Sequence, residues 1–266
     1  RPSEQFTQQL QAALRETFGN QQPPGVFIRS DTNVEDLPGF TGAGLNLTLP
    51  NVVGMENLLQ GIAEVWASPF TARAYAWRQS HMTRPEHVYT SILLLESVAS
   101  DKSGVLVTQD IDTGDGDILS VAVNEGLGGA VDGQAAESLR IPMDGSRVQV
   151  LATATAPWRR VPNPEGGLYL LPSSGSDTVL QPGEIQQLVN FARQLPSTFP
   201  PITDEAGNPA PADVEFGFVD GDLRLFQIRP FLDSKQARGI GYLQQMESRI
   251  PDHHDVQVDM QGVPGT

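Results

Sequence analysis

Apolar side chains recur every three or four residues in parts of the chain, which is the spacing of an amphipathic helix. The segments with this spacing are 4–19, 55–66 and 182–195. A further helix is expected to start after Ser68, because Pro69 suits the first turn of a helix and would break its interior. The pattern therefore predicts helices near the N-terminus, in the first third of the chain and in its last third.

Shorter apolar runs, bounded by residues that favour turns, predict strands. They are 25–30, 45–49, 89–98, 104–111 and 117–129. The run at 89–98 contains three consecutive leucines and predicts a buried strand. Residues 142–182 hold many Pro, Gly and Ser and show little periodicity, so irregular or edge structure is expected there.

Two segments near the C-terminal end read as a β-hairpin that carries an unusual set of polar side chains. Asp213 and Glu215 alternate along the first segment, and Gln227 and Arg229 alternate along the second. Because successive side chains of a strand point to opposite faces, each pair shares one face of its own strand. Whether the two pairs share the same face depends on the turn between them.

The sequence leaves two turns open for this hairpin. A two-residue loop at 220–221 would pair Asp213 with Ile228, so the acids would face away from Gln227 and Arg229. A three-residue loop at 219–221 would pair Asp213 with Gln227, and all four polar groups would share a face. A difference of one residue in register therefore decides whether the groups can form a site.

A shared face would offer the chemistry of a metal and phosphate site. Mg²⁺ takes a few oxygen ligands from carboxylates and amides and keeps phosphate oxygens and water in its shell. Asp213, Glu215 and Gln227 could supply such oxygens, and Arg229 offers a planar fork to a phosphate. The alternative is a solvated strand face with cross-strand charge pairs, which is a common arrangement.

The composition is that of a globular protein with an acidic excess. Of the 266 residues 39% are hydrophobic, and the net charge is −15. This charge repels a polyanion, so nucleic acid is not an expected partner, and no apolar run approaches the roughly 20 residues of a membrane span. The chain has no cysteine, which excludes disulfides and thiolate sites. A cytoplasmic location is expected, and the start at Arg1 instead of Met indicates a fragment or a processed form.

Several motifs in order make the sequence resemble the ATP-binding domain of the pyruvate-phosphate dikinase and phosphoenolpyruvate synthase family. Each motif alone is weak, but together they span roughly residues 10–232. They are Arg29-Ser30 with Glu35-Asp36-Leu37-Pro38-Gly39, Trp66-Ala67-Ser68 with Arg73-Ala74, Gly104-Val105 with Thr108, Gly126-Leu127-Gly128, and Asp213 and Glu215 with Gln227-Arg229-Pro230.

The resemblance implies an α+β fold of the ATP-grasp type, in which two lobes with mixed or antiparallel sheets and flanking helices clamp ATP and Mg²⁺. Residues 1–95 would form part of the first lobe, and residues 96–232 the complete second lobe with the hairpin. Residues 233–266 would form an exit helix or linker toward downstream domains.

The resemblance also implies roles for individual residues. Arg29, Gln227 and Arg229 correspond to catalytic positions, and Asp213, Glu215 and Gln227 correspond to metal ligands. The implied ATP-binding positions are Arg29, Gly39, Gly42, Glu96, Ser97, Val98, Thr108 and Arg229. Among them, Gly39 and Gly42 belong to a stretch over the phosphates, and Glu96–Val98 form the hinge beside adenine.

The implied activity is phosphorylation of a carrier histidine on another domain of the same polypeptide, which then passes the phosphoryl group to a small-molecule acceptor, pyruvate. A glucan or an antibiotic such as rifampicin is the alternative acceptor, since these enzymes share the ATP half-reaction. A non-catalytic binding module is the third hypothesis. It is motivated by Glu96 where the family has Gln and by Gly129 where the family has Glu.

The family carries a Gly-Gly-Lys segment about ninety residues upstream of the Arg-Ser motif, and its lysine binds phosphate. This chain contains no such segment, so the fragment alone is expected to bind ATP weakly and to be inactive. An incomplete first lobe would expose a sheet edge, which makes a homodimer an expected association.

Overall fold

The computed structural model describes residues 2–19, 25–34, 36–37, 40–41, 47–130, 133–204 and 206–231. The chain divides into two units, 1–231 and 232–266, and the second unit lies outside the described residues. The expected exit segment at 233–266 therefore stays a prediction. Among the described residues, no helix is both long enough and apolar enough to cross a membrane.

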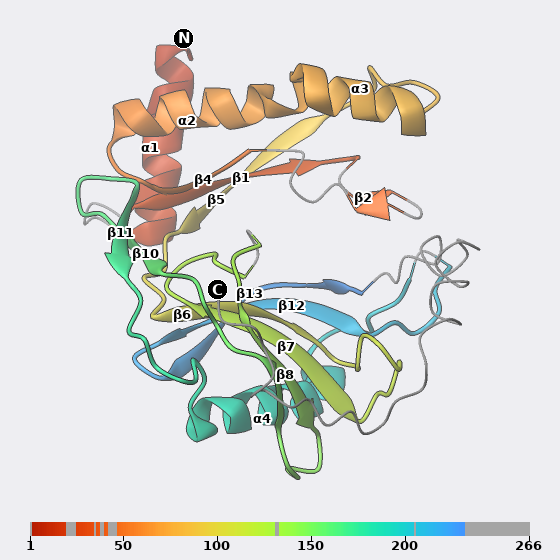
Figure 1. The fold of residues 1–266 in the computed structure, drawn as a ribbon. Coiled ribbons are helices and arrows are strands. Elements are labelled where there is room, and N and C mark those ends of the chain that lie inside the picture. Colours follow the sequence, from red (N-terminus) through yellow and green to blue (C-terminus); the bar gives the residue numbers. More distant parts are fainter. Residues whose placement is uncertain are drawn as a thin grey trace, which may run out of the picture. The chain divides into compact units, whose positions relative to one another are not determined.

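The first part of the chain forms a three-stranded antiparallel sheet with helices on one face (Figure 1). The strand order is β4 (Thr48–Val52), β1 (Val26–Thr32) and β5 (Thr90–Glu96), so β1 lies in the centre. The helices are α1 (Glu4–Phe18), α2 (Met55–Ala67) and α3 (Ala72–His81). A short two-stranded ribbon, β2 (Asp36–Leu37) with β3 (Phe40–Thr41), follows β1.

The core of this layer lies between the sheet and the helices α1 and α2. Its buried members are Leu14, Val26, Ile28, Leu58 and Val65. Helix α2 approaches the sheet closely at Gly61, where a Cβ would lie 2.6 Å from Cδ1 of Ile28. The apolar spacing seen in the sequence is therefore the face that α1 and α2 turn toward β1.

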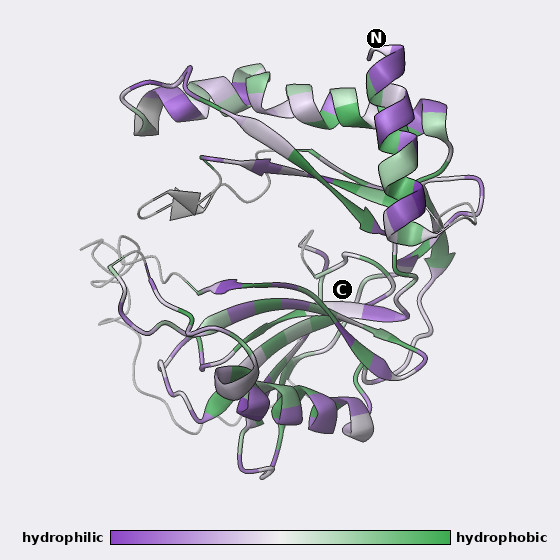
Figure 2. Ribbon diagram, turned by 180° about the vertical axis from the view of Figure 1, so that it is seen from behind, coloured by the Kyte–Doolittle hydropathy of each residue, from purple (hydrophilic) through white to green (hydrophobic). Residues whose placement is uncertain are grey.

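The second layer is a six-stranded antiparallel sheet covered on one face by α4 (Pro182–Thr198) (Figure 1). The strand order is β13 (Asp222–Pro230), β12 (Ala212–Val219), β6 (Lys102–Val107), β7 (Ile118–Glu125), β8 (Glu137–Pro142) and β9 (Gln149–Ala152). Leu106, Leu119, Leu188 and Phe216 are among the buried residues that join α4 to the sheet. Figure 2 shows hydrophobic residues concentrated along the strands of both sheets.

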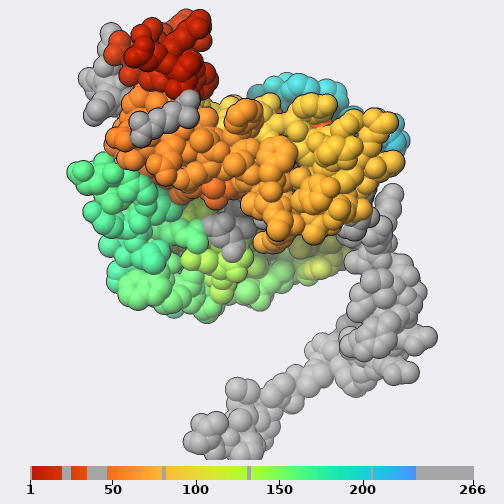
Figure 3. Space-filling view, turned by 90° about the horizontal axis from the view of Figure 1, so that it is seen from above, coloured from red at the N-terminus to blue at the C-terminus, as the bar shows by residue number. Residues whose placement is uncertain are grey.

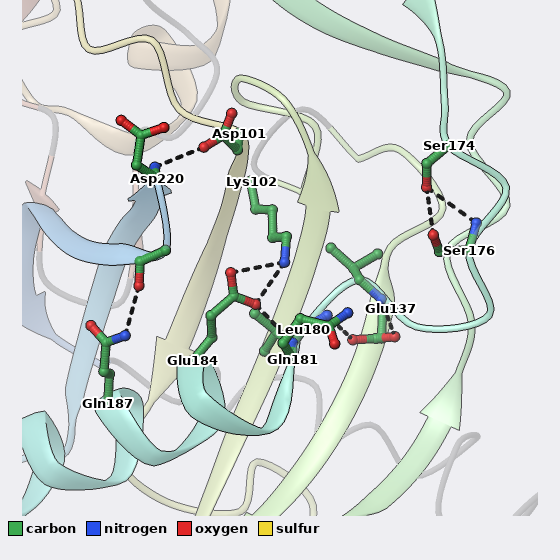
Figure 4. Close-up of polar contacts among 12 residues, drawn as sticks. Asp101, Lys102, Glu137, Ser174, Ser176, Leu180, Gln181, Glu184, Gln187 and Asp220 are labelled. Carbon is green, nitrogen blue, oxygen red and sulfur yellow. Dashed lines mark hydrogen bonds and ion pairs between the residues drawn. The ribbon is translucent and has the colours of Figure 1, made fainter.

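Polar anchors fix α4 on this sheet (Figure 4). Nζ of Lys102 on β6 lies 2.8 and 2.6 Å from the two carboxylate oxygens of Glu184, which also accepts from the backbone N–H of Gln181 at the helix start. The carboxylate of Glu137 is 1% exposed and accepts from the backbone N–H groups of Val179 and Leu180, which precede the helix. Each buried carboxylate thus has hydrogen-bond donors, as burial requires.

A separate hairpin links the two layers. It is formed by β10 (Trp158–Pro162) and β11 (Leu168–Pro172). The Asn51 side chain at β4 donates to the backbone carbonyls of Asn163 and Gly167 in the loop of this hairpin. In the space-filling view the green surface of residues 150–175 accordingly borders the orange surface of residues 50–80 (Figure 3).

The structure confirms most of the helices and strands predicted from the spacing, and it corrects three predictions. The helix expected after Ser68 is a 3-10 turn at Ser68–Phe70, and α3 starts only after Thr71, whose side chain caps it. The region 142–182, where irregular or edge structure was expected, contains β9 at the edge of the six-stranded sheet and the two-stranded hairpin of β10 and β11. The strand expected at 45–49 is β4, shifted toward the C-terminus.

The third correction concerns β5, which is not a fully buried strand. Its side chains alternate between half-buried and exposed positions, and Leu93 is 48% exposed. The reason is that helices cover only one face of this sheet, so the second face keeps its leucines accessible. The leucine run signals a strand but not the number of faces that are covered.

Candidate functional site

The turn of the β12–β13 hairpin is the shorter of the two that the sequence allows. Val219 pairs with Asp222, so the loop contains only Asp220 and Gly221, with φ of 52° and 82°. Two consecutive residues with positive φ are typical of the hairpin turn that matches strand twist. Asp101 and Gln187 hold this turn through hydrogen bonds to the backbone of Asp220 and Gly221 (Figure 4).

A β-bulge in β13 then changes the register in favour of a shared face. Phe216 pairs with Leu225, but Glu215 pairs with Gln227, so Phe226 is an extra residue in β13. Asp213 consequently lies opposite Arg229. The four polar groups therefore share one face. The sequence alone linked a shared face to the three-residue loop, but here the turn has two residues and the bulge shifts the register instead.

Gly217 provides the space that the bulge needs. A Cβ at this position would lie 2.8 and 2.9 Å from two atoms of the Phe226 ring and 2.6 Å from Oγ of Ser100. A real Cβ does not approach other atoms so closely, so any larger residue would displace the ring. Gly217 thus allows the extra residue of the bulge to pack against β12, next to Glu215.

The four polar groups of the hairpin and Arg29 of the other sheet make two groups of contacts. Nε of Arg229 lies 2.8 Å from Oδ2 of Asp213. Arg29, from β1, donates through Nη2 to Oε1 of Gln227 at 2.6 Å, and its Nη1 lies 3.7 Å from Oε2 of Glu215. The side chains of Arg29 and Glu215 are 24% and 21% exposed, so the contact between the sheets is only partly shielded from water.

The face of the first sheet that carries Arg29 also presents apolar side chains. Phe27 lies opposite Leu95, and Arg29 lies opposite Leu93. Leu95 is 37% exposed, so this face is accessible beside the arginine. A cation next to an apolar, accessible strand surface suits a ligand with a flat apolar part and an anionic part. The leucines of β5 were visible in the sequence, but the exposure of Leu93 and Leu95 on this face was not.

The expected hinge residues connect the end of β5 to its neighbours. Ser97 donates from its backbone N–H to the carbonyl of Gly25 at 2.9 Å, and its Oγ accepts from the backbone N–H of Asn51 at 3.0 Å. Glu96 is exposed and Val98 is half-buried. These contacts fix the path of the chain at the point where it leaves the first sheet and enters β6.

The other residues expected to bind ATP do not contact the four polar groups of the hairpin in the part of the chain that the structure describes. Oγ1 of Thr108 accepts from the backbone N–H of Ala212 at 2.8 Å, so this hydroxyl extends the ladder between β6 and β12. Thr108 lies next to the pair of Val107 and Asp213, and its hydroxyl bonds to the backbone of β12 instead of to the four polar groups. Gly39 and Gly42 lie outside the described residues.

The donor set of the hairpin fits magnesium. Among the residues that the structure describes, no group of three or more His, Cys, Asp or Glu is placed to hold a metal. Asp213 and Glu215 supply two carboxylates and Gln227 one amide oxygen on a common face. Mg²⁺ commonly takes one or two carboxylates and completes its shell with phosphate oxygens and water, whereas Zn²⁺ prefers His and Cys. Each carboxylate here already lies beside a guanidinium, so binding a cation would shift these ion pairs.

The glycine loop after β7 leaves little space for a side chain at position 129, where the resemblance implies a glutamate. Oγ of Ser103 donates to the carbonyl of Gly126 and accepts from the N–H of Gly128, at 2.6 and 2.8 Å. A Cβ at Gly129 would lie 2.7 Å from Oε1 of Gln134 and 2.9 Å from Cβ of Asn124. The side chains of Gln134 and Asn124 therefore occupy the space that a side chain at position 129 would need.

One ion pair on the same sheet escaped sequence reasoning. Oδ2 of Asp110 lies 2.7 Å from Nε of Arg140, and Oδ1 accepts from the backbone N–H groups of Asp112 and Thr113. Burial of the Asp110 carboxyl alone would raise its pKa, but the two backbone hydrogen bonds and the Arg140 guanidinium together hold the pKa below its ordinary value of 3.8.

A pH dependence of folding follows from Asp110. Because its pKa is lower in the folded chain than in the unfolded chain, its contribution is present above the ordinary pKa and is lost as the pH falls through the folded pKa. We expect the free energy of unfolding of Asp110→Asn to depend less on pH below about pH 4. The slope should fall by up to about 1.4 kcal/mol per pH unit, which corresponds to one proton bound on unfolding. Urea denaturation at several pH values measures this slope, and Asp117→Asn, in the same loop, is the matched control. Equal slopes for Asp110→Asn and the unsubstituted chain would contradict the assignment.

The fold and the match to a known family define the class of protein. The chain is an α+β protein with antiparallel sheets and an ATP-grasp-like fold. It belongs to the family of pyruvate phosphate dikinase AMP/ATP-binding domains, which matches residues 2–248.

Curated relatives come from two groups of phosphotransferases. A rifampicin phosphotransferase of Bacillus cereus is 32% identical over 209 residues, which cover 76% of this chain and 23% of the relative. A probable phosphoenolpyruvate synthase of Methanothermobacter thermautotrophicus is 31% identical over 216 residues, covering 80% and 30%. The phosphoenolpyruvate synthase of Pyrococcus furiosus is 28% identical over 234 residues, covering 84% and 28%. The chain thus spans less than a third of the length of these relatives.

Proposed function

We propose that the chain binds ATP with Mg²⁺ between its two sheets and supplies the phosphoryl group in a multidomain phosphotransferase. The contact of Arg29 with Glu215 and Gln227 is the observation that supports this proposal most directly. It brings the arginine of one sheet to the acid and amide of the other, where a triphosphate would need both cations and metal ligands.

Each residue of the set has a definite task in this proposal. Arg29 and Arg229 neutralise phosphate charge, and Asp213, Glu215 and Gln227 hold the metal. A bound Mg²⁺ supplies positive charge that stabilises the phosphate oxygens during transfer. Phe27, Leu93 and Leu95 offer an apolar surface to the base, and the hinge at 96–98 lies at the end of the same strand. Positioning and charge neutralisation are the main needs of phosphoryl transfer, so no covalent help from this chain is required.

The acceptor lies outside this chain in the proposal. The phosphoryl group passes to a histidine on a carrier domain of the same polypeptide and from there to pyruvate. Rifampicin is the second candidate acceptor, because relatives named rifampicin phosphotransferases are about as similar to the chain as the phosphoenolpyruvate synthases are. The ATP-binding part alone does not discriminate between acceptors, since function is set by sites elsewhere in such proteins.

Titration calorimetry with Mg-ATP tests the proposed site in the full-length polypeptide that contains this chain. We expect saturable binding that needs Mg²⁺ and that Glu215→Gln weakens by about 10- to 100-fold, the loss expected for contacts with a charged group. Glu165→Gln, an exposed acid in the β10–β11 loop, is the matched control and should leave the affinity unchanged. The absence of heat at millimolar nucleotide would instead support a non-catalytic binding module.

A further inference from the structure

A β-bulge in β4 sets the position of Asn51. Val26 pairs with Val52 and Ile28 pairs with Leu49, so a single residue of β1 lies opposite positions 50 and 51 of β4. Asn51 has a φ of 51°, a left-handed conformation that asparagine adopts more readily than most residues. A bulge re-aims a side chain, and here the amide of Asn51 reaches the loop of the β10–β11 hairpin.

Asn51 joins three segments that are distant in the sequence. Its Nδ2 donates to the carbonyls of Asn163 and Gly167, at 2.8 and 2.6 Å, and its own carbonyl accepts from the backbone N–H of Gly167 at 2.8 Å. Its backbone N–H donates to Oγ of Ser97, in the expected hinge, at 3.0 Å. At 4% exposure Asn51 is shielded from water, so water does not readily replace these hydrogen bonds. The residue therefore ties the end of β4 to the hinge and to the β10–β11 loop.

The chain before β1 packs directly against Asn51 at Gly25. A Cβ at position 25 would lie 1.9 Å from Oδ1 and 2.9 Å from Cα of Asn51, so a larger residue has no room there. The carbonyl of Gly25 accepts from the backbone N–H of Ser97 at 2.9 Å. Ser97 is thus held on two sides, through its hydroxyl by Asn51 and through its N–H by Gly25. A displacement of Asn51 would loosen both contacts.

These contacts act on one end of the proposed nucleotide site. The hinge continues β5, whose exposed Leu93 and Leu95 belong to the surface proposed for the base. The proposed metal ligands lie instead on β12 and β13 of the other sheet. Because the hydrogen-bond partners of Asn51 lie in the hinge and in the β10–β11 loop, a change at Asn51 acts first on the base end and leaves the metal and phosphate end in place.

We propose that Asn51 is a positioning residue for the base of the nucleotide. It acts through Ser97 and Gly25 and fixes the hinge in the place where the base binds. The inference rests on the proposed function, because the hinge is part of the proposed ATP site. Asn51→Asp is the sharpest change, since it keeps the shape of the side chain but replaces the donating Nδ2 by an oxygen that faces two carbonyl oxygens.

Titration calorimetry of the full-length polypeptide with two probes tests the role of Asn51. Mg-ATP contains the base, and Mg-tripolyphosphate offers the same metal and phosphates without it. We expect Asn51→Asp to weaken Mg-ATP binding by about tenfold or more and to change Mg-tripolyphosphate binding by less than about twofold. Asn190→Asp, on the exposed surface of α4, adds the same charge and should bind both probes as the unsubstituted protein does. A merely structural role would weaken both probes by the same factor.

Hydrogen exchange of the ligand-free polypeptide gives a second readout, which does not depend on ATP. We expect Asn51→Asp to speed exchange by about tenfold or more in peptides that contain Ser97 or Gly167, while peptides from β7 and β8 keep their rates. If circular dichroism shows that Asn51→Asp does not fold, Asn51→Gly takes its place in both experiments. Glycine tolerates a φ of 51°, so this variant loses only the side chain.

Three results would overturn the inference. They are unchanged Mg-ATP affinity in the Asn51 variant, equal weakening of both probes, and unchanged exchange rates in the hinge. The absence of Mg-ATP binding to the unsubstituted polypeptide is a different result. It would reject the proposed function and the role toward the base with it, while the exchange rates would still decide whether Asn51 fixes the hinge.

Discussion

Arg29→Ala is expected to weaken Mg-ATP binding in the full-length polypeptide by about 10- to 100-fold, which corresponds to roughly 1.5 to 3 kcal/mol for hydrogen bonds to a charged group. The substitution removes the guanidinium that joins β1 to Glu215 and Gln227. Two effects combine: a phosphate loses a charge-assisted partner, and the carboxylate of Glu215 is left without the cation that offsets its repulsion of a triphosphate. Titration calorimetry at fixed Mg²⁺ measures the change.

Two further variants separate charge from geometry at this position. Arg29→Lys keeps the charge but loses the planar fork, so its affinity should lie between those of the unsubstituted protein and Arg29→Ala. Arg15→Ala, on the exposed surface of α1, removes the same charge far from the hairpin contacts and controls for the overall field. If Arg15→Ala weakened binding as much as Arg29→Ala does, general electrostatics would account for the effect and the proposed contact would be wrong.

The sequence predicted the elements of the fold better than their exposure. Helical spacing located α1, α2 and α4 because their apolar faces are regular, and the leucines of β5 located a strand. The exposure of Leu93 and Leu95 depends on which face of the sheet the helices cover. Tertiary packing decides this, and the local sequence pattern does not show it. The strands between 149 and 172 were predicted only as irregular or edge structure, because their prolines and glycines mask the alternation and the β9, β10 and β11 side chains are exposed or half-buried.

The candidate site shows a similar limit. Residue types and alternation identified Asp213, Glu215, Gln227 and Arg229 as a set, and the family motif supplied Arg29. The register of the hairpin could not be derived, because the turn at Asp220–Gly221 by itself predicts opposite faces. The extra residue Phe226 reverses that outcome, and its only trace in the sequence is a glycine at position 217, which strand propensity alone would count as a weakness.

The bulge itself gives the second prediction, which couples stability to the site. Gly217→Ala places a Cβ 2.8 Å from the ring of Phe226. Because overpacked interiors lose about 1 to 3 kcal/mol, we expect the free energy of unfolding to fall by roughly 2 kcal/mol. Displacement of the ring also shifts the bulge that keeps Gln227 opposite Glu215, so Mg-ATP affinity should fall together with stability. Urea denaturation and calorimetry on the same preparations measure both quantities.

A double-mutant cycle with Phe226→Ala tests whether the collision with the ring is the cause. Removing the ring alone costs little, since Phe226 is 40% exposed, but it opens the space that the new Cβ would need. The pair Gly217→Ala and Phe226→Ala should therefore recover half or more of the lost stability, with the contact to Ser100 accounting for the remainder. Additive losses in the double variant would mean that Gly217 is required for another reason, and the bulge would then not be what sets the register of the four polar groups.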